Sequence, residues 1–440
     1  MGGTEPRRVD LSSDIDARCG TSYSAAMQIT DIEIHEIHPP LAAWNGDEVR
    51  LSSGDNWDAR TVVVLRCDNG LEGITEWEGP PRDASIADVE QLRGTNPCRW
   101  LAHPSLPIWI APAIYDLVGK ANDVPAYQLF GPKIRSWVPV ASWTVSQTPQ
   151  RMAMELEDAV RHGHRWLKFH TYHLHNVIEQ TRAMQQVAPP GFKVHYDINF
   201  DNTPDEVLTL ARELAAFPVA GLIEDPVRSF DLQGHIHLRQ RSPLPIILHH
   251  CPLGGREAMM GVADGYMLGH SPVGQTLQRA GLYEAANVPF MTQNNGGNIT
   301  LAMVVHMAAA LDRATLHHVS LARLWSEDVV EPFKVVGGQV EVPEAPGLGL
   351  TLDREALARL KSRAVEPLSE SLLRIDHGPG LVTCSRPPIA RLPRDLHMHL
   401  AGVGAGYDLP VDLTYWPNDG SEAFRQMWSR SANGPVTERA

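Results

Sequence analysis

Apolar and polar positions follow one pattern before about residue 137 and another after it. Between residues 28 and 79 they alternate, as in ITDIEIHEI, and two β-branched runs are joined by Asn69-Gly70, a pair typical of hairpin turns. A stretch with helical spacing, IWIAPAIYDLVGKANDVPAYQLFG, follows and ends at Gly131-Pro132. The pattern predicts an α+β domain over residues 28–136, preceded by an N-terminal extension over residues 1–27.

From residue 137 onward, eight short apolar runs each end in polar or ionisable residues, with helical stretches between them. The runs are WVPVASW, RWLKFH, FKVHYDIN, VAGLIEDP, PIILHHC, DGYMLGH, VPFMTQN and ATLHHVS. A strand and a helix that repeat about every 20 to 30 residues are typical of parallel β/α units, and eight such units close into a barrel. We therefore expect an α/β fold, a (β/α)8-type barrel (a modified TIM barrel), over residues 137–330.

Composition and charge limit the classes of partner that we expect this chain to bind. Of 440 residues, 43% are hydrophobic and 20% charged, and no apolar run approaches the ~18 residues of a membrane span. The net charge is −14 without a basic cluster, which argues against nucleic acid as a partner. Five scattered cysteines and the lack of an apolar leader favour a reduced, cytoplasmic location.

The carboxyl ends of three successive predicted strands carry the chemistry. Residues two apart on a strand share a face, so Asp197 and Asn199 point together, as do Leu248 and His250. If the last residue of each strand faces the mouth of the barrel, Asp197, Glu224 and His250 converge there. Two carboxylates and an imidazole predict a divalent-cation site. On this interpretation His249 and Cys251 face the surrounding helices.

Lys168 and His170 end the strand before the first predicted ligand. A lysine or a histidine close to a bound substrate is suited to act as a general base, and either residue fits that role here.

These residues carry a resemblance to a known family. From about residue 28 to 365 the chain resembles the enolase superfamily, in its mandelate racemase/muconate lactonizing enzyme branch. The similar stretches are APAIYDLVGKANDVPAYQLFG, LKFH, HYDIN and LIEDP, and the segment EPFKVVGGQVEVPEAPGLGLTLD looks like the family's return to its capping domain. The resemblance implies a capping domain over residues 28–136, a return to it over residues 331–373, and a metal ion that stabilises the anion formed by α-proton removal.

The family pattern is broken at several positions. His170 stands where the family has the second lysine of its Lys-x-Lys motif. His250 stands where the family has an acidic third metal ligand. Gly269 replaces the sixth-strand Asp beside His270, and Gln293 replaces the seventh-strand His. The eighth-strand acidic group is missing, with His317 and His318 nearest. An imidazole ligand weakens the preference for Mg²⁺, so Mg²⁺ is the first choice while Mn²⁺, Fe²⁺ and Zn²⁺ stay open.

In this family, substrate specificity is set by a loop that follows the first strand of the capping domain. Here this loop is long and offers rings, amides and charges suited to sugar hydroxyls, while the mouth is rich in histidine, with His173 and His175 as further members. The predicted substrate-binding residues are Trp44, Asn45, Trp57, Arg60, Asn199, His270 and Gln293.

Three functions remain open. The first is a metal-dependent lyase that dehydrates a sugar acid, with Lys168 or His170 as the base and His318 as the acid that protonates the leaving hydroxyl. The second is a one-base epimerase or racemase of the same family, which the missing Asp/His dyad disfavours. The third is a non-catalytic protein that binds a sugar or an acid. Residues 374–440 are expected to form a packed extension or an oligomer contact, and the chain to form a homo-oligomer.

Overall fold

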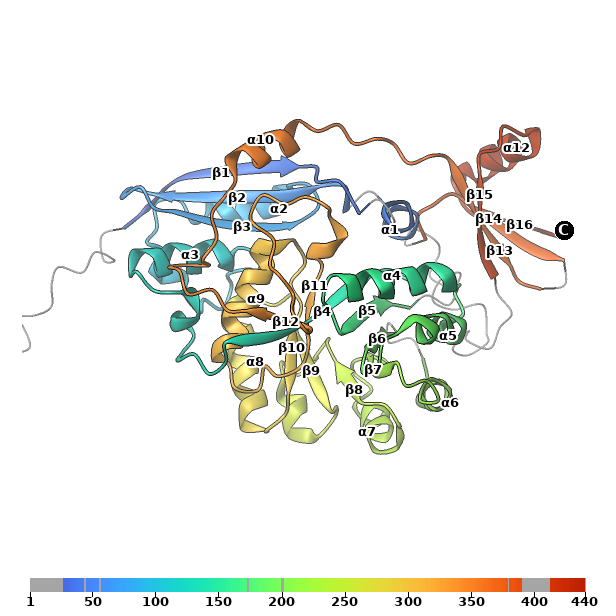
Figure 1. Cartoon of the computed structure of the whole chain (residues 1–440), viewed down its shortest axis with the longest axis horizontal. Helices are drawn as coiled ribbons and strands as arrows, with labels where there is room; N and C mark the ends of the chain where they lie inside the picture. Colours follow the sequence, from blue (N-terminus) through green and yellow to red (C-terminus); the bar gives the residue numbers. More distant parts are fainter. Residues whose placement is uncertain are drawn as a thin grey trace, which may run out of the picture.

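The computed structural model describes residues 27–42, 45–54, 57–171, 174–198, 202–378, 380–389 and 412–439. In these residues a three-stranded sheet lies over one side of a parallel barrel, and a small sheet near the C-terminus lies beside both (Figure 1).

The capping domain is the antiparallel sheet β1-β2-β3 with its helices, as the alternating pattern predicts. The strands are β1 (Ile29–Ile37), β2 (Arg60–Cys67) and β3 (Glu72–Glu78), and the hairpin between β2 and β3 has Gly70 at φ 82°. The helices are α1 (Gly46–Ser53), α2 (Asp83–Glu90), α3 (Ala111–Ala121) and the 3-10 turns η2 (Pro97–Trp100) and η3 (Ala126–Leu129). Helix α3 contacts β3 at Gly73, where a Cβ would lie 2.2 Å from the Ala113 carbonyl oxygen.

All eight predicted barrel strands form. They are β4 (Trp137–Thr144), β5 (Trp166–His170), β6 (Lys193–Asp197), β7 (Ala220–Glu224), β8 (Ile246–Leu248), β9 (Gly265–Leu268), β10 (Phe290–Thr292) and β11 (His318–Ser320). Neighbours from β4 to β10 pair in parallel, β11 pairs with β4, and a parallel bridge between Gln293 and Val319 joins the last two strands. The sheet therefore closes, which confirms the predicted barrel.

Helices follow most of these strands. They are α4 (Pro149–Arg161), α5 (Val177–Val187), α6 (Pro204–Leu214), α7 (Leu232–Arg241), α8 (Val273–Ala285) and α9 (Asn298–Ala310). Only short 3-10 turns follow β8 and β11, namely η4 (Arg256–Met260) and η5 (Ala322–Leu324). Helix α6 begins with a capping box between Thr203 and Glu206.

The chain then returns to the capping domain before it reaches a third unit. Strand β12 (Gln339–Glu341) pairs with β4, and α10 (Arg354–Ser362) lies along β1 (Figure 1). Beyond them, β13 (Ser371–Asp376), β14 (Leu381–Ser385), β15 (Asp412–Pro417) and β16 (Val436–Arg439) form an antiparallel sheet in the order β15-β13-β14-β16, with α12 (Glu422–Arg430) and the turn η7 (Ser431–Asn433).

The C-terminal segment, for which we expect a packed extension or an oligomer contact, forms a small sheet with a helix packed on it. Phe424 and Met427 of α12 pack against Leu372, Val382 and Cys384 of the sheet. This small apolar core explains why so short a segment forms regular structure.

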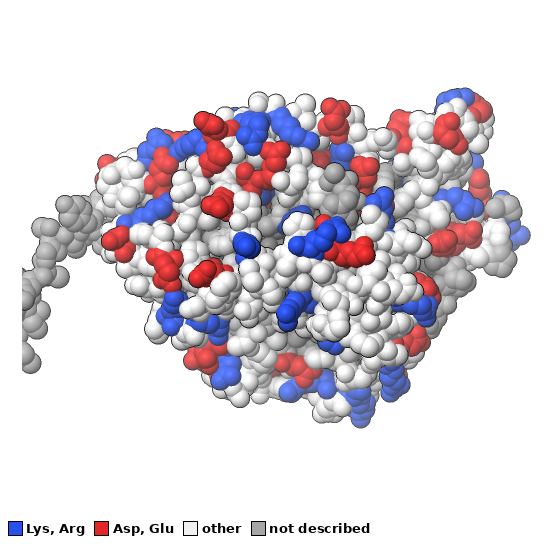
Figure 2. All heavy atoms as spheres, viewed as in Figure 1, with Lys and Arg blue, Asp and Glu red and all other residues white. Residues whose placement is uncertain are grey.

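No helix in the described ranges is long and apolar enough to cross a bilayer. Acidic and basic side chains are interspersed over the face shown in Figure 2.

Candidate active site

A buried ion cluster lies at the carboxyl ends of β5, β6 and β7. Lys168 Nζ is 2.6 Å from Glu224 Oε2 and 3.2 Å from Asp197 Oδ2, and it donates to Gln293 Oε1 at 2.9 Å. Lys168 and Glu224 are fully buried, and Asp197 is 5% exposed. The structure thus brings together four of the residues that sequence reasoning selected, because Gln293, which directly follows β10, is also a partner of Lys168.

The three charges shift one another's pKa. Burial alone would lower the pKa of Lys168, but the two adjacent carboxylates raise it above its usual value. Burial and the mutual repulsion of the carboxylates would raise the pKa of Asp197, yet His170 and Lys168 hold it at about 2. Glu224, also buried, has a pKa well below its usual range because Lys168 and His195 lie against it. Lysine and carboxylates are therefore ionised together.

His195 of β6 is a member of the cluster that sequence reasoning missed. Its Nε2 is 2.5 Å from Glu224 Oε2, and it is paired in register with Lys168. Burial lowers its pKa more strongly than Glu224 raises it. The signal was present, since His195 lies two residues before Asp197 and so shares its face.

His249, rather than His250, faces the barrel interior. Ile247 packs in the interior with Leu222 and Met267, and His249 is two residues further along the same face. Its Nδ1 is 3.0 Å from Glu224 Oε1, and the side chain is 6% exposed. The interpretation that His249 faces the surrounding helices is therefore wrong, whereas Cys251 does pack in the outer layer.

His250 has a different partner from the one expected. Its Nδ1 is 2.6 Å from Asp225 Oδ2, and its side chain is half exposed. This hydrogen bond outweighs burial and raises the pKa of His250. Asp225 also accepts from the His249 backbone N–H, so this one carboxylate positions both histidines. Ligand atoms of Asp225, His249 and His250 lie within 4.8 Å of one another.

A cavity of about 250 Å³, which we call the site cavity, opens above this cluster. His170 lines it, with its Nε2 3.1 Å from Asp197 Oδ2 and its ring edge-on to Trp143, whereas Lys168 lies below its wall. The remaining lining residues come from several strand ends and from the capping domain: Trp57, Trp143, Asp197, His249, His250, His270, Gln293, Asn295 and Leu321.

Of the two histidines predicted at the later strands, His270 lies at the site cavity and His318 does not. His270 lines the site cavity, stacks on His249 at 5.3 Å and has a positive φ of 57°; burial and then the neighbouring histidines lower its pKa to about 4. His318 faces away from the mouth, because Val319 points inward. One ring nitrogen accepts from the Thr292 backbone N–H and the other donates to the Ala314 carbonyl, so the prediction that His318 protonates a leaving group is wrong.

The long capping loop supplies fewer binding residues than expected. Trp57 does line the site cavity, where it packs on Trp143. Arg60 is fully buried away from it, 2.5 Å from Asp328 and 3.4 Å from Glu76. Asn45 is buried and donates to Glu155 at 2.7 Å, so it fastens α1 to α4. Both predictions of substrate binding are therefore wrong.

Trp44, Asn199 and His173 lie outside the described residues. His175 is buried against Ser146, with a pKa lowered to about 4 by burial.

Comparison with known proteins shows which family the sequence of this chain resembles. The family model for the enolase C-terminal domain-like fold matches residues 151–356. Muconate cycloisomerase 1 of Pseudomonas putida is 26% identical over 272 residues, 58% of this chain and 71% of that protein. D-xylonate dehydratase of Haloferax volcanii is 29% identical over 275 residues, 56% of this chain and 66% of that protein. A third relative, the N-succinyl-L-Arg/Lys racemase of Bacillus cereus, is 22% identical over 76% of this chain and 98% of its own length.

Solved structures agree on the fold. A muconate lactonizing enzyme of Pseudomonas fluorescens, complexed with muconolactone, superposes with a TM-score of 0.62 at 24% identity, over 76% of this chain and 99% of that one. An isomerase from Streptomyces coelicolor gives a TM-score of 0.61 at 19% identity, with the same coverage.

Proposed function

The chain belongs to the enolase superfamily, in its mandelate racemase/muconate lactonizing enzyme branch, and from this premise we propose that it is a metal-dependent carbon–oxygen lyase that dehydrates a sugar acid. The observation that carries the proposal is the ion cluster of Lys168, Asp197 and Glu224 beneath a cavity lined by imidazoles. The likeness to a D-xylonate dehydratase supports the substrate class.

Asp197, Glu224 and His249 would hold the divalent ion. A carboxylate only accepts, so His249 donates to Glu224 through Nδ1–H, and its Nε2 lone pair is left buried without a hydrogen-bond partner among the described residues. Two carboxylates and this imidazole nitrogen fit a divalent cation. Mg²⁺ is the first choice, and Mn²⁺, Fe²⁺ and Zn²⁺ are alternatives because a nitrogen ligand weakens the preference for Mg²⁺. When bound, the ion would supply positive charge that favours the anion developing on the substrate carboxylate.

His170 is the proposed base. It lines the site cavity, and its Nε2–H donates to Asp197, which leaves Nδ1 with the lone pair that takes the proton α to the substrate carboxylate. Lys168 is fully buried and held by two carboxylates, so we assign it the role of a fixed positive charge beneath the developing anion.

His250 is the proposed proton donor. It lines the same cavity, Asp225 fixes its ring, and the β-hydroxyl leaves as water when it takes a proton from this imidazole. The resulting enol tautomerises to a 2-keto-3-deoxy acid. Replacement of His250 by Gln should abolish dehydration but leave removal of the α-proton by His170 intact.

The test is product formation from a panel of five- and six-carbon aldonates. The protein, loaded in turn with Mg²⁺, Mn²⁺, Fe²⁺ and Zn²⁺, is incubated with each aldonate, and 2-keto-3-deoxy acid is measured as its semicarbazone. We expect product with at least one sugar acid, a loss of at least 100-fold in Glu224→Gln, and no loss in the control His162→Gln, which alters an exposed histidine directly after α4. No product from any aldonate, by a protein shown to bind the metal, would refute the proposal.

A further inference from the structure

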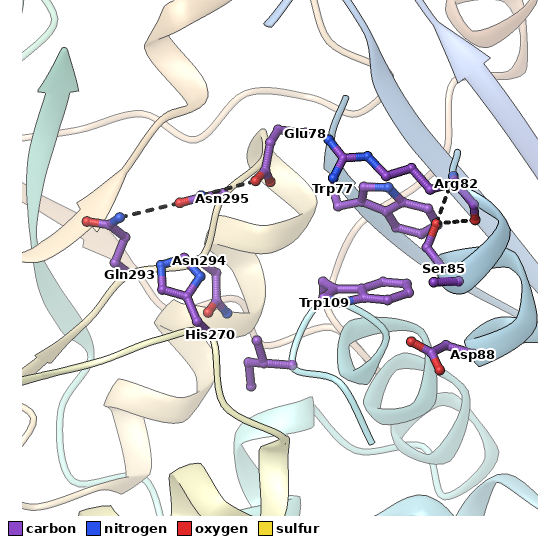
Figure 3. A pocket seen from close by; sticks show the side chains of 12 residues that line it. Trp77, Glu78, Arg82, Ser85, Asp88, Trp109, His270, Gln293, Asn294 and Asn295 are labelled. Atoms are coloured by element: carbon purple, nitrogen blue, oxygen red, sulfur yellow. Dashed lines mark hydrogen bonds between the residues drawn. The ribbon is translucent and has the colours of Figure 1, made fainter. Parts of the chain in front are cut away.

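A second cavity adjoins the site cavity at the junction of the capping domain and the barrel. This side cavity has a volume of about 300 Å³ and shares His270, Gln293 and Asn295 with the site cavity. Trp77, at the end of β3, and Trp109, which precedes α3, form its capping-domain wall, opposite the residues that follow β9 and β10 (Figure 3). A molecule in the site cavity therefore has a neighbouring space into which it can extend.

A line of hydrogen bonds runs from the ion cluster to the side cavity. Lys168 Nζ donates to Gln293 Oε1 at 2.9 Å, Gln293 Nε2 donates to Asn295 Oδ1 at 3.4 Å, and Asn295 Nδ2 donates to Glu78 Oε1 at 3.2 Å. Figure 3 shows the last two of these bonds along the cavity wall. The two cavities thus share one polar wall, which presents amide groups to both.

Asn294 provides the strongest sign that the side cavity is built for a ligand. Its side chain lines the cavity and is only 6% exposed, and neither its Oδ1 nor its Nδ2 has a hydrogen-bond partner among the residues described. A buried amide without a partner is costly, and such groups are rare in folded proteins. A ligand with both donors and acceptors would satisfy the two atoms.

The walls indicate what kind of ligand fits. The Trp77 and Trp109 rings lie with centroids 4.4 Å apart at 59°, so they offer apolar faces beside the amides of Asn294 and Asn295. A sugar ring has apolar C–H faces and a rim of hydroxyls that both donate and accept, and it matches this combination of surfaces. The charged lining residues are one arginine, Arg82, and two acids, Glu78 and Asp88, which disfavours a second anionic group.

We propose that the substrate is an aldonic acid that carries a second, uncharged sugar ring, and that this ring occupies the side cavity. The inference rests on the proposed sugar-acid function: the acid end lies in the site cavity above Asp197, and the distal ring contacts Trp77, Trp109 and Asn294. The enzyme would then act on disaccharide acids in preference to single-ring acids.

The test compares ligands with and without the second ring. Titration calorimetry on the full-length, Mn²⁺-loaded protein measures the affinity for gluconate and for three glycosyl gluconates, cellobionate, maltobionate and melibionate. We expect at least one of the three to bind at least tenfold more tightly than gluconate. Ser85→Trp, which fills the side cavity from α2, and Asn294→Leu should each reduce this ratio to about one. Ala87→Trp is the matched control, because Ala87 is exposed on the same helix outside the cavity, and it should leave the ratio unchanged.

Two results would overturn the inference, and they are distinguishable. If gluconate binds as tightly as every disaccharide acid, or if Ser85→Trp leaves the ratio at its original value, the side cavity holds no sugar ring although the sugar-acid function stands. If neither gluconate nor any glycosyl gluconate binds, the inference falls, and the proposed function falls with it only if the full aldonate panel also gives no product.

Discussion

His249 and His250 are adjacent in the chain but serve different carboxylates. His249 is bound to Glu224, and its second ring nitrogen is buried with no hydrogen-bond partner in the described part of the chain, whereas His250 is half exposed and bound to Asp225. This difference separates a proposed metal ligand from a proposed proton donor, and substitution of each should separate the two roles.

The first prediction concerns the metal. We expect His249→Ala to lower the affinity for Mn²⁺ by at least 100-fold, because it removes a nitrogen ligand, while His250→Ala stays within about threefold of the wild type. Elemental analysis and calorimetry on the purified variants measure both values. If instead His250→Ala loses the ion and His249→Ala keeps it, our assignment of the third ligand is wrong.

The second prediction concerns Lys168. Lys168→Met removes the cation between Asp197 and Glu224 and leaves two buried carboxylates to repel each other, so the free energy of unfolding should fall by about 3–5 kcal/mol. A divalent ion would replace the lost charge, and Mn²⁺ should therefore raise the melting temperature of this variant more than that of the wild type. A variant as stable as the wild type in the presence of a chelator would contradict the account.

Strand parity explains which site residues could be predicted from the sequence. In FKVHYDIN and VAGLIEDP the carboxylates ended their strands on the inner face, as expected. PIILHHC offers no alternation, because parallel strands are apolar on both faces, so the choice between His249 and His250 had no local signal. The run ATLHHVS has the same ambiguity, and for this reason the prediction that His318 faces the mouth of the barrel was wrong. Arg60 and Asn45 were chosen for their chemistry, but each binds a carboxylate that is distant in sequence: Arg60 pairs with Asp328, and Asn45 donates to Glu155.

At the scale of elements, Arg323 holds the barrel where no helix follows β11. From the short turn η5, its guanidinium is 2.6 Å from Glu155 Oε2 and also pairs with Asp158, both on α4, and its Nε donates to Ser142 of β4. Glu155 is fully buried, and Arg323 places a positive charge directly against it.

The third prediction follows from that contact. Arg323→Met should lower the free energy of unfolding by about 3–5 kcal/mol, because it leaves Glu155 buried without a counter-charge. The control Arg161→Ala removes a 63% exposed partner of Asp158 and should cost less than about 1 kcal/mol. Denaturant unfolding measures both, and equal effects of the two variants would refute the role assigned to Arg323.

Elements were easier to predict than their packing. Each barrel strand and the β2–β3 hairpin carried a local signal in their apolar runs and turn residues. The C-terminal sheet did not, because its outer strands β15 and β16 pair with β13 and β14 only across long separations in sequence. The side cavity was equally hidden, since its walls come from both the capping domain and the barrel.

Over the whole molecule, buried histidines make stability depend on pH. Burial lowers the pKa of His164 and His318 to about 3 and that of His306 to about 4, against 6.5 in the unfolded chain. Their neutral forms are favoured by the fold, so stability is complete above pH 6.5 and is lost as the pH falls from there toward the folded pKa. As the pH falls from 7 to 5, each of these histidines should lower the free energy of unfolding by about 2 kcal/mol.

The fourth prediction tests this dependence at one position. His306→Gln removes a buried titrating group whose nitrogens bond to the Tyr127 and Leu348 backbones, so the stability lost between pH 7 and pH 5 should shrink by about 2 kcal/mol. Urea unfolding at the two pH values measures the loss, with the exposed His162→Gln as the control. An identical loss in wild type and His306→Gln would contradict the account.

Exchange of the α-proton in deuterated water tests the central claim most directly, because it reports proton removal without requiring that the hydroxyl leave. A sugar acid that binds is incubated with the metal-loaded protein, and loss of its C2 proton signal is followed by NMR. We expect exchange in the wild type and in His250→Gln, and none in His170→Gln or after the metal is removed by a chelator. Exchange that survives both the chelator and His170→Gln, or no exchange by the metal-loaded wild type with any bound sugar acid, would contradict metal-dependent proton abstraction at this site.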